Sequence, residues 1–149
     1  MEFRPIGFVR SPVKEPVDES WGSVVSRILL TKPWGRGLKG LEEFSHLLIV
    51  FHMHQATHNP KTDLVRRPRG RADMPEAGIF AQRARHRPNP IGITAVRLLD
   101  IRSSTLTVQG LDAVDGSPVL DIKPYVPEFD RVAKPKVPSW MKKLLQGYF

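Results

Sequence analysis

The sequence contains no cysteine, and that absence removes several kinds of chemistry at once. Without thiols the chain can form neither disulfides nor cysteine zinc sites, and it has no thiolate nucleophile. Long hydrophobic runs are missing too, because the longest, Leu47–Phe51, is far shorter than the roughly 20 residues needed to cross a bilayer. The opening segment Met1–Pro5 has an early acidic residue and a proline where a signal peptide has an apolar run. We therefore expect a cytoplasmic protein with no membrane partner.

Internal repeats, low-complexity segments and long helical patterns are absent as well. The chain has 149 residues, of which 40% are hydrophobic, and this is enough for one core without metal ions or disulfides. We expect a single domain over residues 1–149 that ends, over 128–149, in a proline-rich tail and a short helix.

Positive charge is in excess, and it is concentrated in one part of the chain. Lys and Arg number 23 against 15 Asp and Glu, which gives a formal net charge of +8. Much of the excess falls on Arg66, Arg67, Arg69, Arg71, Arg83, Arg85, Arg87 and His86. Such a patch suits a polyanion, so nucleic acid is the leading partner and an anionic small ligand the second. A merely solvated basic face is the alternative.

The segment Arg83–Gly92 combines arginines with a stiff backbone. Pro88 and Pro90 fix their own φ angles and push the residues before them into an extended conformation. Gly92 would let a ligand or another chain approach the main chain closely, and the arginines carry planar forks suited to carboxylate or phosphate. We interpret the segment as a binding loop, with a rigid basic turn as the alternative.

Short β-branched or alternating segments, separated by turn signals, make up much of the remaining chain. Strands are expected over 3–10, 23–30, 46–54, 78–82, 93–101, 105–109 and 119–122. The segment 46–54 is nearly continuously apolar, which is typical of a strand covered on both faces. About seven short strands with little helix favour a mainly β fold, either a barrel or a sandwich.

The segments between these strands are expected to hold little regular structure. Residues 55–76 have no apolar period, so we expect a long basic loop whose length itself suggests a function. One or two helical turns are expected over 40–44, and a short C-terminal helix could be capped by Ser139.

Three other arrangements are weaker. His52, His54 and His58 could in principle share a metal ion, since residues two apart on a strand lie on one face. No carboxylate stands at a suitable spacing, so we expect no metal and assign these histidines to hydrogen bonding or stacking. No serine lies in a glycine-flanked elbow, which argues against a Ser-His-Asp hydrolase. The glycines beside Arg36 do not lead from a strand into a long helix, which argues against a dinucleotide-binding loop.

The turn from Asp112 to Asp121 presents several carboxylates and backbone groups from one rigid point. It contains Asp115 and Gly116, a pair that strongly favours a tight turn. An ordinary hairpin turn and a binding loop are both compatible with this pattern.

Four motifs resemble those of the TsaA-like family, also called YaeB-like or TrmO-type, and they occur in the family's order. They are Ile6–Pro12, Phe44–Leu47, Arg87–Gly92 and Asp115–Tyr125. The resemblance implies a single-sheeted β-barrel that acts as a homodimer and binds S-adenosylmethionine. It also implies methylation of the N6 nitrogen of threonylcarbamoyladenosine, beside the anticodon of a tRNA.

The resemblance further implies a cofactor site assembled from several segments. Its residues would be Trp21, Gly22, Met53, His54, Gln55, Arg83, Gly92, Asp115, Gly116, Ser117 and Pro118. Other arginines are expected to contact RNA: Arg66, Arg67, Arg69, Arg71, Arg85 and Arg87.

The implied chemistry fits residues of these types. Methyl transfer needs the acceptor nitrogen held in line with the methyl group, and it requires neither a metal ion nor a nucleophilic side chain. A carboxylate or histidine is expected near the nitrogen to receive its proton, but the sequence does not single one out. The positive sulfonium repels a guanidinium, so Arg83 and Arg87 are expected at the cofactor's carboxylate or at an RNA phosphate. A non-catalytic RNA-binding barrel is the alternative.

Overall fold

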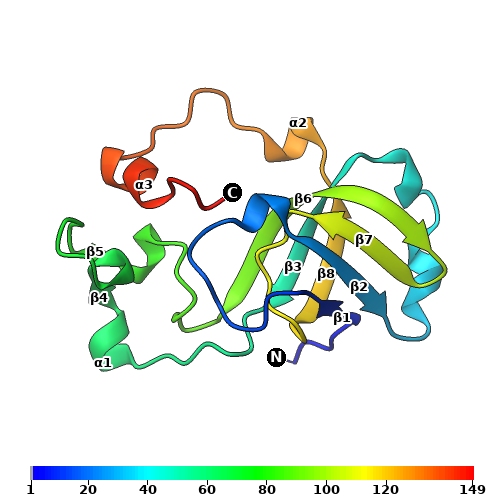
Figure 1. Ribbon diagram of the computed structural model, residues 1–149, viewed down its shortest axis with the longest axis horizontal. Coiled ribbons are helices and arrows are strands. Elements are labelled where there is room, and N and C mark those ends of the chain that lie inside the picture. The colour runs from blue at the N-terminus through cyan, green and yellow to red at the C-terminus, as the bar shows by residue number, and fades with distance from the viewer. Residues whose placement is uncertain (1) are drawn as a thin grey trace.

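A closed β-barrel and a smaller lobe beside it form the structure, a computed structural model that describes residues 2–149 (Figure 1). Six antiparallel strands close the barrel in the order β1-β2-β7-β6-β3-β8. Their bounds are β1 Gly7–Arg10, β2 Val25–Leu30, β3 His46–His52, β6 Ile91–Arg102, β7 Thr105–Gln109 and β8 Pro118–Pro124. The predicted mainly β fold is confirmed, and it takes the form of a barrel, not a sandwich.

The apolar residues alternate along each strand, because neighbouring side chains point to opposite faces of a sheet. On β3 the side chains of Leu47, Ile49 and Phe51 are buried, whereas Leu48 and Val50 are half-buried. The second face of this strand is thus only partly covered, where the sequence pattern predicts full covering. One face lines the barrel interior, with Val9, Ile28, Val96, Leu106, Val108 and Val119 from the other strands.

The basic lobe, residues 58–87, lies at the left of Figure 1, where α1, β4 and β5 are labelled. It contains α1 Pro60–Asp63, β4 Val65–Arg66, η4 Pro68–Gly70, β5 Ala77–Gly78 and η5 Ile79–Ala81. Strands β4 and β5 pair with each other in a two-stranded sheet, which makes the number of strands differ slightly from the expected one.

Two predictions in this region are wrong. Residues 55–76 are not a plain loop, because they include α1, β4 and η4. The strand expected over 78–82 ends at Gly78, where the chain turns into η5 and the Gln82 N–H donates to the Ile79 carbonyl at 3.2 Å.

Short helices connect the remaining strands and form the C-terminal region. They are η1 Trp21–Ser23, η2 Trp34–Leu38, η3 Leu41–Glu43, α2 Pro127–Asp130 and α3 Ser139–Leu144. The expected helical turn at 40–44 is η3, and the expected C-terminal helix is α3. Ser139 is not its cap, because the N-cap residue is Pro138 and makes no side-chain capping bond. Within residues 2–149 no helix has the length and apolar character needed to cross a membrane.

Candidate functional site

The loop that precedes β8 is hydrogen-bonded to the loop that follows β1, mainly through Asp115. The Asp115 carboxylate accepts hydrogen bonds from the Ser11 N–H at 3.0 Å and from the Lys14 ammonium at 2.8 Å. The Asp115 N–H donates to the Val13 carbonyl at 2.8 Å. Gly116, at φ 79°, adopts the left-handed conformation that the Asp-Gly pair predicted.

These contacts also hold the Asp115 carboxylate in its charged form. The hydrogen bond from Lys14 is the largest cause that lowers its pKa below 3.8, and the Ser11 N–H adds to the effect. The carboxylate is therefore charged at neutral pH and forms an ion pair with the Lys14 ammonium.

The end of β3 reaches the same loop. The His54 Nδ1 lies 3.4 Å from the Ser117 hydroxyl, and the Gln55 amide donates to the Lys14 carbonyl at 3.0 Å. The Met53 N–H donates to the Pro90 carbonyl at 2.8 Å. This bond connects the end of β3 to the arginine-proline segment, Arg83–Gly92. The structure thus brings Met53, His54, Gln55, Asp115, Gly116 and Ser117 together as one group of interacting segments.

Gly92 lies against a side chain of the barrel core. A Cβ built on Gly92 would lie 2.3–2.7 Å from three carbon atoms of the Phe51 ring. The space on the Cβ side of this glycine is thus filled by a core side chain, and the expected contact of Gly92 with the cofactor stays a prediction. Gly92 is needed so that β6 can pass over Phe51 inside the barrel.

Trp21 and Gly22 lie against the C-terminal segment. The Trp21 N–H donates to the Tyr148 carbonyl at 2.8 Å, and a Cβ on Gly22 would lie 2.7 Å from the Phe149 backbone. Trp21 is buried, and its indole N–H donates to the Val17 carbonyl at 3.0 Å. Both residues therefore help to hold the chain's last residues on the barrel.

Tyr148 connects this segment to the loop that contains Asp115. Its hydroxyl donates to Asp112 at 2.7 Å, and Thr94 on β6 donates to the other oxygen of Asp112. Burial and the neighbouring Asp112 raise the pKa of Tyr148, so the phenol stays neutral and remains a donor. The guanidinium of Arg69, a residue of the basic lobe, lies 5.9 Å from the centre of the Tyr148 ring. This is within the range of a cation–π interaction, which links the lobe to the C-terminal segment.

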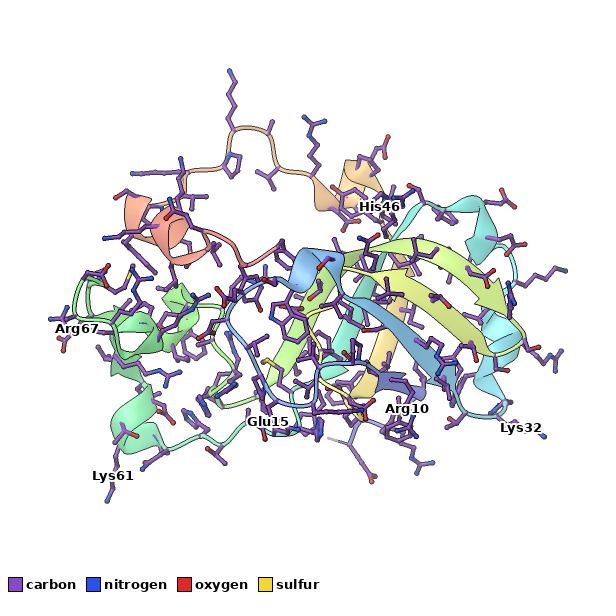
Figure 2. The ribbon with its side chains drawn as sticks, in the orientation of Figure 1. Arg10, Glu15, Lys32, His46, Lys61 and Arg67 are labelled. Atoms are coloured by element: carbon purple, nitrogen blue, oxygen red, sulfur yellow. The ribbon has the colours of Figure 1, made fainter. Side chains whose placement is uncertain are left out.

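The arginines of the basic lobe have internal partners. Arg66 lies 3.5 Å from Asp63, Arg69 lies 3.4 Å from Asp18, and Arg67 donates to the Met74 carbonyl. Arg71 binds Asp73 through two nitrogens at 2.9 and 2.7 Å. These residues thus stabilise the lobe, and any RNA contact would use their remaining donors. Figure 2 shows Arg67 and Lys61 at the outer edge of the lobe, at the opposite end of the molecule from Lys32.

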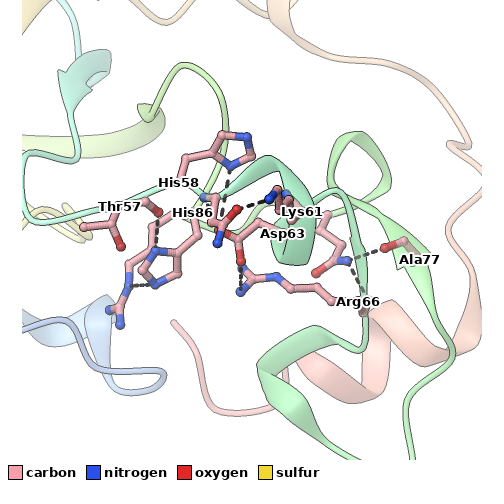
Figure 3. Close-up of polar contacts among 10 residues, drawn as sticks. Thr57, His58, Lys61, Asp63, Arg66, Ala77 and His86 are labelled. Carbon is pink, nitrogen blue, oxygen red and sulfur yellow. Dashed lines mark hydrogen bonds and ion pairs between the residues drawn. The ribbon is translucent and has the colours of Figure 1, made fainter.

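A second polar chain runs from the arginine-proline segment to the start of the lobe (Figure 3). The Nδ1 of His86 donates to the Thr57 carbonyl at 2.6 Å, since a carbonyl can only accept. The Nε2 of His86 accepts from Arg85 at 3.0 Å, so both ring nitrogens of His86 have partners. Arg83 donates to the Ile93 carbonyl at 2.7 Å, and Arg87 donates to the Gln82 carbonyl at 3.3 Å. The segment is therefore pre-shaped by its own side chains.

An open depression of about 530 Å³ borders the Asp115 loop on the outer wall of the barrel. Its lining includes Arg10, Lys14, Arg27 and Asp115. Arg10 and Arg27 face each other across β1 and β2, which gives this wall a positive potential. Within residues 2–149 no three His, Asp or Glu side chains are grouped so that they could hold a metal ion.

Comparison with known proteins identifies the family. The tRNA-methyltransferase O N-terminal domain family, TrmO_N, matches residues 11–131. The chain belongs to the TrmO_N family. The resemblance inferred from the four sequence motifs is thereby confirmed.

Several TrmO_N relatives are similar over most of the chain. A probable S-adenosyl-L-methionine-binding protein of Pyrococcus abyssi is 38% identical, over 95% of this chain and 76% of the relative. The tRNA (adenine(37)-N6)-methyltransferase of Escherichia coli is 42% identical, over 85% of this chain and 58% of the relative. The crystal structure of TrmO from Pseudomonas aeruginosa has a TM-score of 0.73 and 35% identity, over 91% of this chain and 60% of that one. The chain therefore spans about three fifths of the length of the crystallised TrmO.

Sequence reasoning missed several residues that build the site of this TrmO_N chain. Lys14 stands in a polar stretch without a period, and nothing in that stretch indicates that it binds Asp115. Asp112 begins the turn that the sequence predicts, but its partners Thr94 and Tyr148 lie far from it in the sequence. Only the closure of the barrel and the return of the tail bring these three together.

Proposed function

We propose that this TrmO_N chain is an S-adenosylmethionine-dependent methyltransferase that acts on a tRNA base, the N6 nitrogen of threonylcarbamoyladenosine beside the anticodon. The observation that carries the proposal is the cluster around Asp115. In this cluster the motifs Ile6–Pro12, Arg87–Gly92 and Asp115–Tyr125 are hydrogen-bonded to one another or to the residues that follow β3. The relatives named as S-adenosylmethionine-binding proteins and as tRNA (adenine(37)-N6)-methyltransferases support it. A tRNA substrate also favours a cytoplasmic location.

The residues of the cluster suit a sulfonium cofactor. The Asp115 carboxylate is already paired with Lys14, and Ser117 and His54 add a hydroxyl and an imidazole. The hydroxyl oxygen and the carbonyl oxygens of the loop suit a positive sulfonium, which a guanidinium would repel. Bound S-adenosylmethionine would supply a methyl group that forms a bond to the base nitrogen as its bond to sulfur breaks, with the electron pair left on sulfur.

The chain's own residues would then position the reactants. Arg83, whose guanidinium donates to the Ile93 carbonyl on β6, is proposed to bind the cofactor's carboxylate through a charge-assisted hydrogen bond. His54 is the group in the cluster that could take the proton lost by the nitrogen, because the lowered pKa of Asp115 makes that carboxylate a weak base. The basic lobe would face the RNA phosphates, because its arginines keep the positive charge that the polyanion requires.

Calorimetry of S-adenosylmethionine binding, with and without a chelator, tests the proposal. We expect binding that the chelator does not affect, and transfer of labelled methyl groups from the cofactor to tRNA. Arg83→Ala should weaken cofactor binding by about 1.5–3 kcal/mol, the typical value of a hydrogen bond to a charged group. Arg36→Ala, on the exposed helix η2, is the matched control and should change nothing.

Two results would count against this function. Binding that disappears with chelator would indicate a metal in the site. Tight RNA binding without any cofactor binding would favour the non-catalytic RNA-binding barrel.

We also infer that the protein is a homodimer. The outward-facing side of β6 supports this inference, because Ile91 and Ile93, two residues apart on the strand, are 41% and 45% exposed. Neighbouring apolar side chains on one outer wall are typical of a surface that a second subunit covers. Light scattering at micromolar concentration should give the mass of a dimer, and the mass of a monomer would contradict the inference.

A further inference from the structure

Phe80 is an exposed aromatic side chain on a rigid base. Its side chain is 81% exposed, although its neighbours Ile79 and Gln82 are only 1% and 4% exposed. The Ile79 N–H donates to the Leu64 carbonyl at 2.9 Å. The Gln82 amide donates to the carbonyls of Arg66 and Ala77 at 3.0 and 2.7 Å, and Figure 3 shows the bond to Ala77. The turn η5 is therefore fixed on both sides of Phe80 and holds this ring out of the lobe.

The surroundings of Phe80 are basic. The turn is hydrogen-bonded through Gln82 to Arg66 on strand β4, and the chain after it contains Arg83, Arg85 and Arg87. The guanidinium of Arg87 donates to the carbonyl of Gln82, two residues from the ring. An aromatic face among arginines is the combination with which proteins bind single-stranded nucleic acid, since the arginines neutralise phosphates and the ring stacks on a base.

Exposure alone would not support this argument, as Phe129 shows. Phe129 is 87% exposed on α2, but its neighbours in the sequence are Glu128 and Asp130. Their negative charges repel phosphates, so a nucleic acid has no reason to approach that ring. The two phenylalanines differ in local charge and not in exposure, and this makes Phe129 a matched control.

We propose that Phe80 is a stacking platform for a nucleobase of the RNA substrate. The inference rests on the proposed function, which supplies the RNA. It adds a binding residue that none of the four sequence motifs contains. Because hydrogen bonds fix the backbone on both sides of Phe80, stacking requires little ordering of the main chain that carries the ring.

The test measures binding of a short single-stranded RNA and of an abasic oligonucleotide of the same length, by fluorescence anisotropy. Phe80→Leu keeps an apolar side chain but removes the ring. We expect it to weaken binding of the RNA by roughly 5-fold to 100-fold, the usual effect of losing one stacked base. Binding of the abasic oligonucleotide should not change, since its phosphates still meet the arginines. Phe80→Trp should restore RNA binding, and Phe129→Leu should leave it as in the wild type.

The outcomes separate this inference from the proposed function. If the wild type binds no RNA, the proposed function fails and this inference fails with it. If the wild type binds RNA and Phe80→Leu binds it equally well, only the stacking role is overturned. A loss of S-adenosylmethionine affinity or of the dimer in Phe80→Leu, with RNA binding unchanged, would overturn it too, because the ring would then contact the cofactor or a second subunit. An unchanged unfolding midpoint confirms that the variant is folded, as expected for a side chain that is 81% exposed.

Discussion

The barrel and the basic lobe are stabilised in different ways, although they belong to one short chain. In the barrel, buried apolar side chains such as Ile49 and Val96 fill the interior, and strand pairs close the sheet. In the lobe, buried apolar residues are few, and polar side chains reach backbone carbonyls instead, as Gln82 and Arg67 do. The comparison teaches that a cluster of arginines can stabilise a local structure through its own ion pairs and hydrogen bonds.

The largest expected effect is in the barrel interior. Ile49→Ala removes a side chain that is 0% exposed, and such changes typically cost about 2–5 kcal/mol. Urea denaturation should show the loss for the whole protein, because the barrel unfolds as one unit. Val65→Ala, at a site that is 63% exposed in the lobe, is the control and should have little effect. A small loss for Ile49→Ala would mean that the barrel core is not the main source of stability.

The close contact between Gly92 and Phe51 gives the next effect. Gly92→Ala would place a methyl group against the ring, and overpacking of this kind typically costs about 1–3 kcal/mol. The double variant Gly92→Ala/Phe51→Leu should lose less than the sum of the two single variants, since the smaller side chain leaves room. Additive losses in urea denaturation would show that the two residues do not conflict.

A lobe variant should produce a local effect instead of a global one. Gln82→Met keeps the shape of a buried side chain but leaves the carbonyls of Arg66 and Ala77 without this donor. Unpaired buried groups cost about 1–3 kcal/mol, so we expect faster hydrogen exchange within residues 58–87. Exchange in β3 and β6 should stay as in the wild type. Equal acceleration in the barrel would show that the two regions open together.

The smallest expected effect is a loss of folding stability at low pH. The pKa of Asp115 is lowered chiefly by Lys14, and that of Asp63, in the lobe, chiefly by the N–H of Asn59. Because both folded-state values lie below 3.8, the unfolded chain takes up these protons first as the pH falls. The stabilising contribution is therefore present above pH 3.8 and disappears as the pH falls through the lower folded-state values.

Thermal melts between pH 5 and pH 2 would measure this contribution. Asp115→Asn should lose part of the acid dependence, and Asp63→Asn should lose another part. Melting temperatures whose acid dependence is the same in both variants as in the wild type would contradict the assignment.

The sequence predicts the barrel better than the lobe, for a physical reason. Alternating apolar residues, such as Leu106 and Val108 on β7, reflect a sheet with one buried face, so the pattern reveals the strand. The lobe depends on single side-chain contacts to distant carbonyls, and no periodic pattern records them. The same holds at the site, where the Asp-Gly turn is visible in the sequence but the bond from Tyr148 to Asp112 is not.

The way the barrel closes also affects how the protein is made. Gly7 on β1 pairs with Val119 on β8, so the first strand needs a partner that the ribosome adds more than a hundred residues later. Contacts between such distant positions slow folding, since a long loop must be ordered before they form. During synthesis β1 and β2 can pair as a hairpin, while the other edge of β1 stays open until β8 has emerged. An open strand edge invites pairing with another chain, so the nascent protein is most prone to aggregate in that interval.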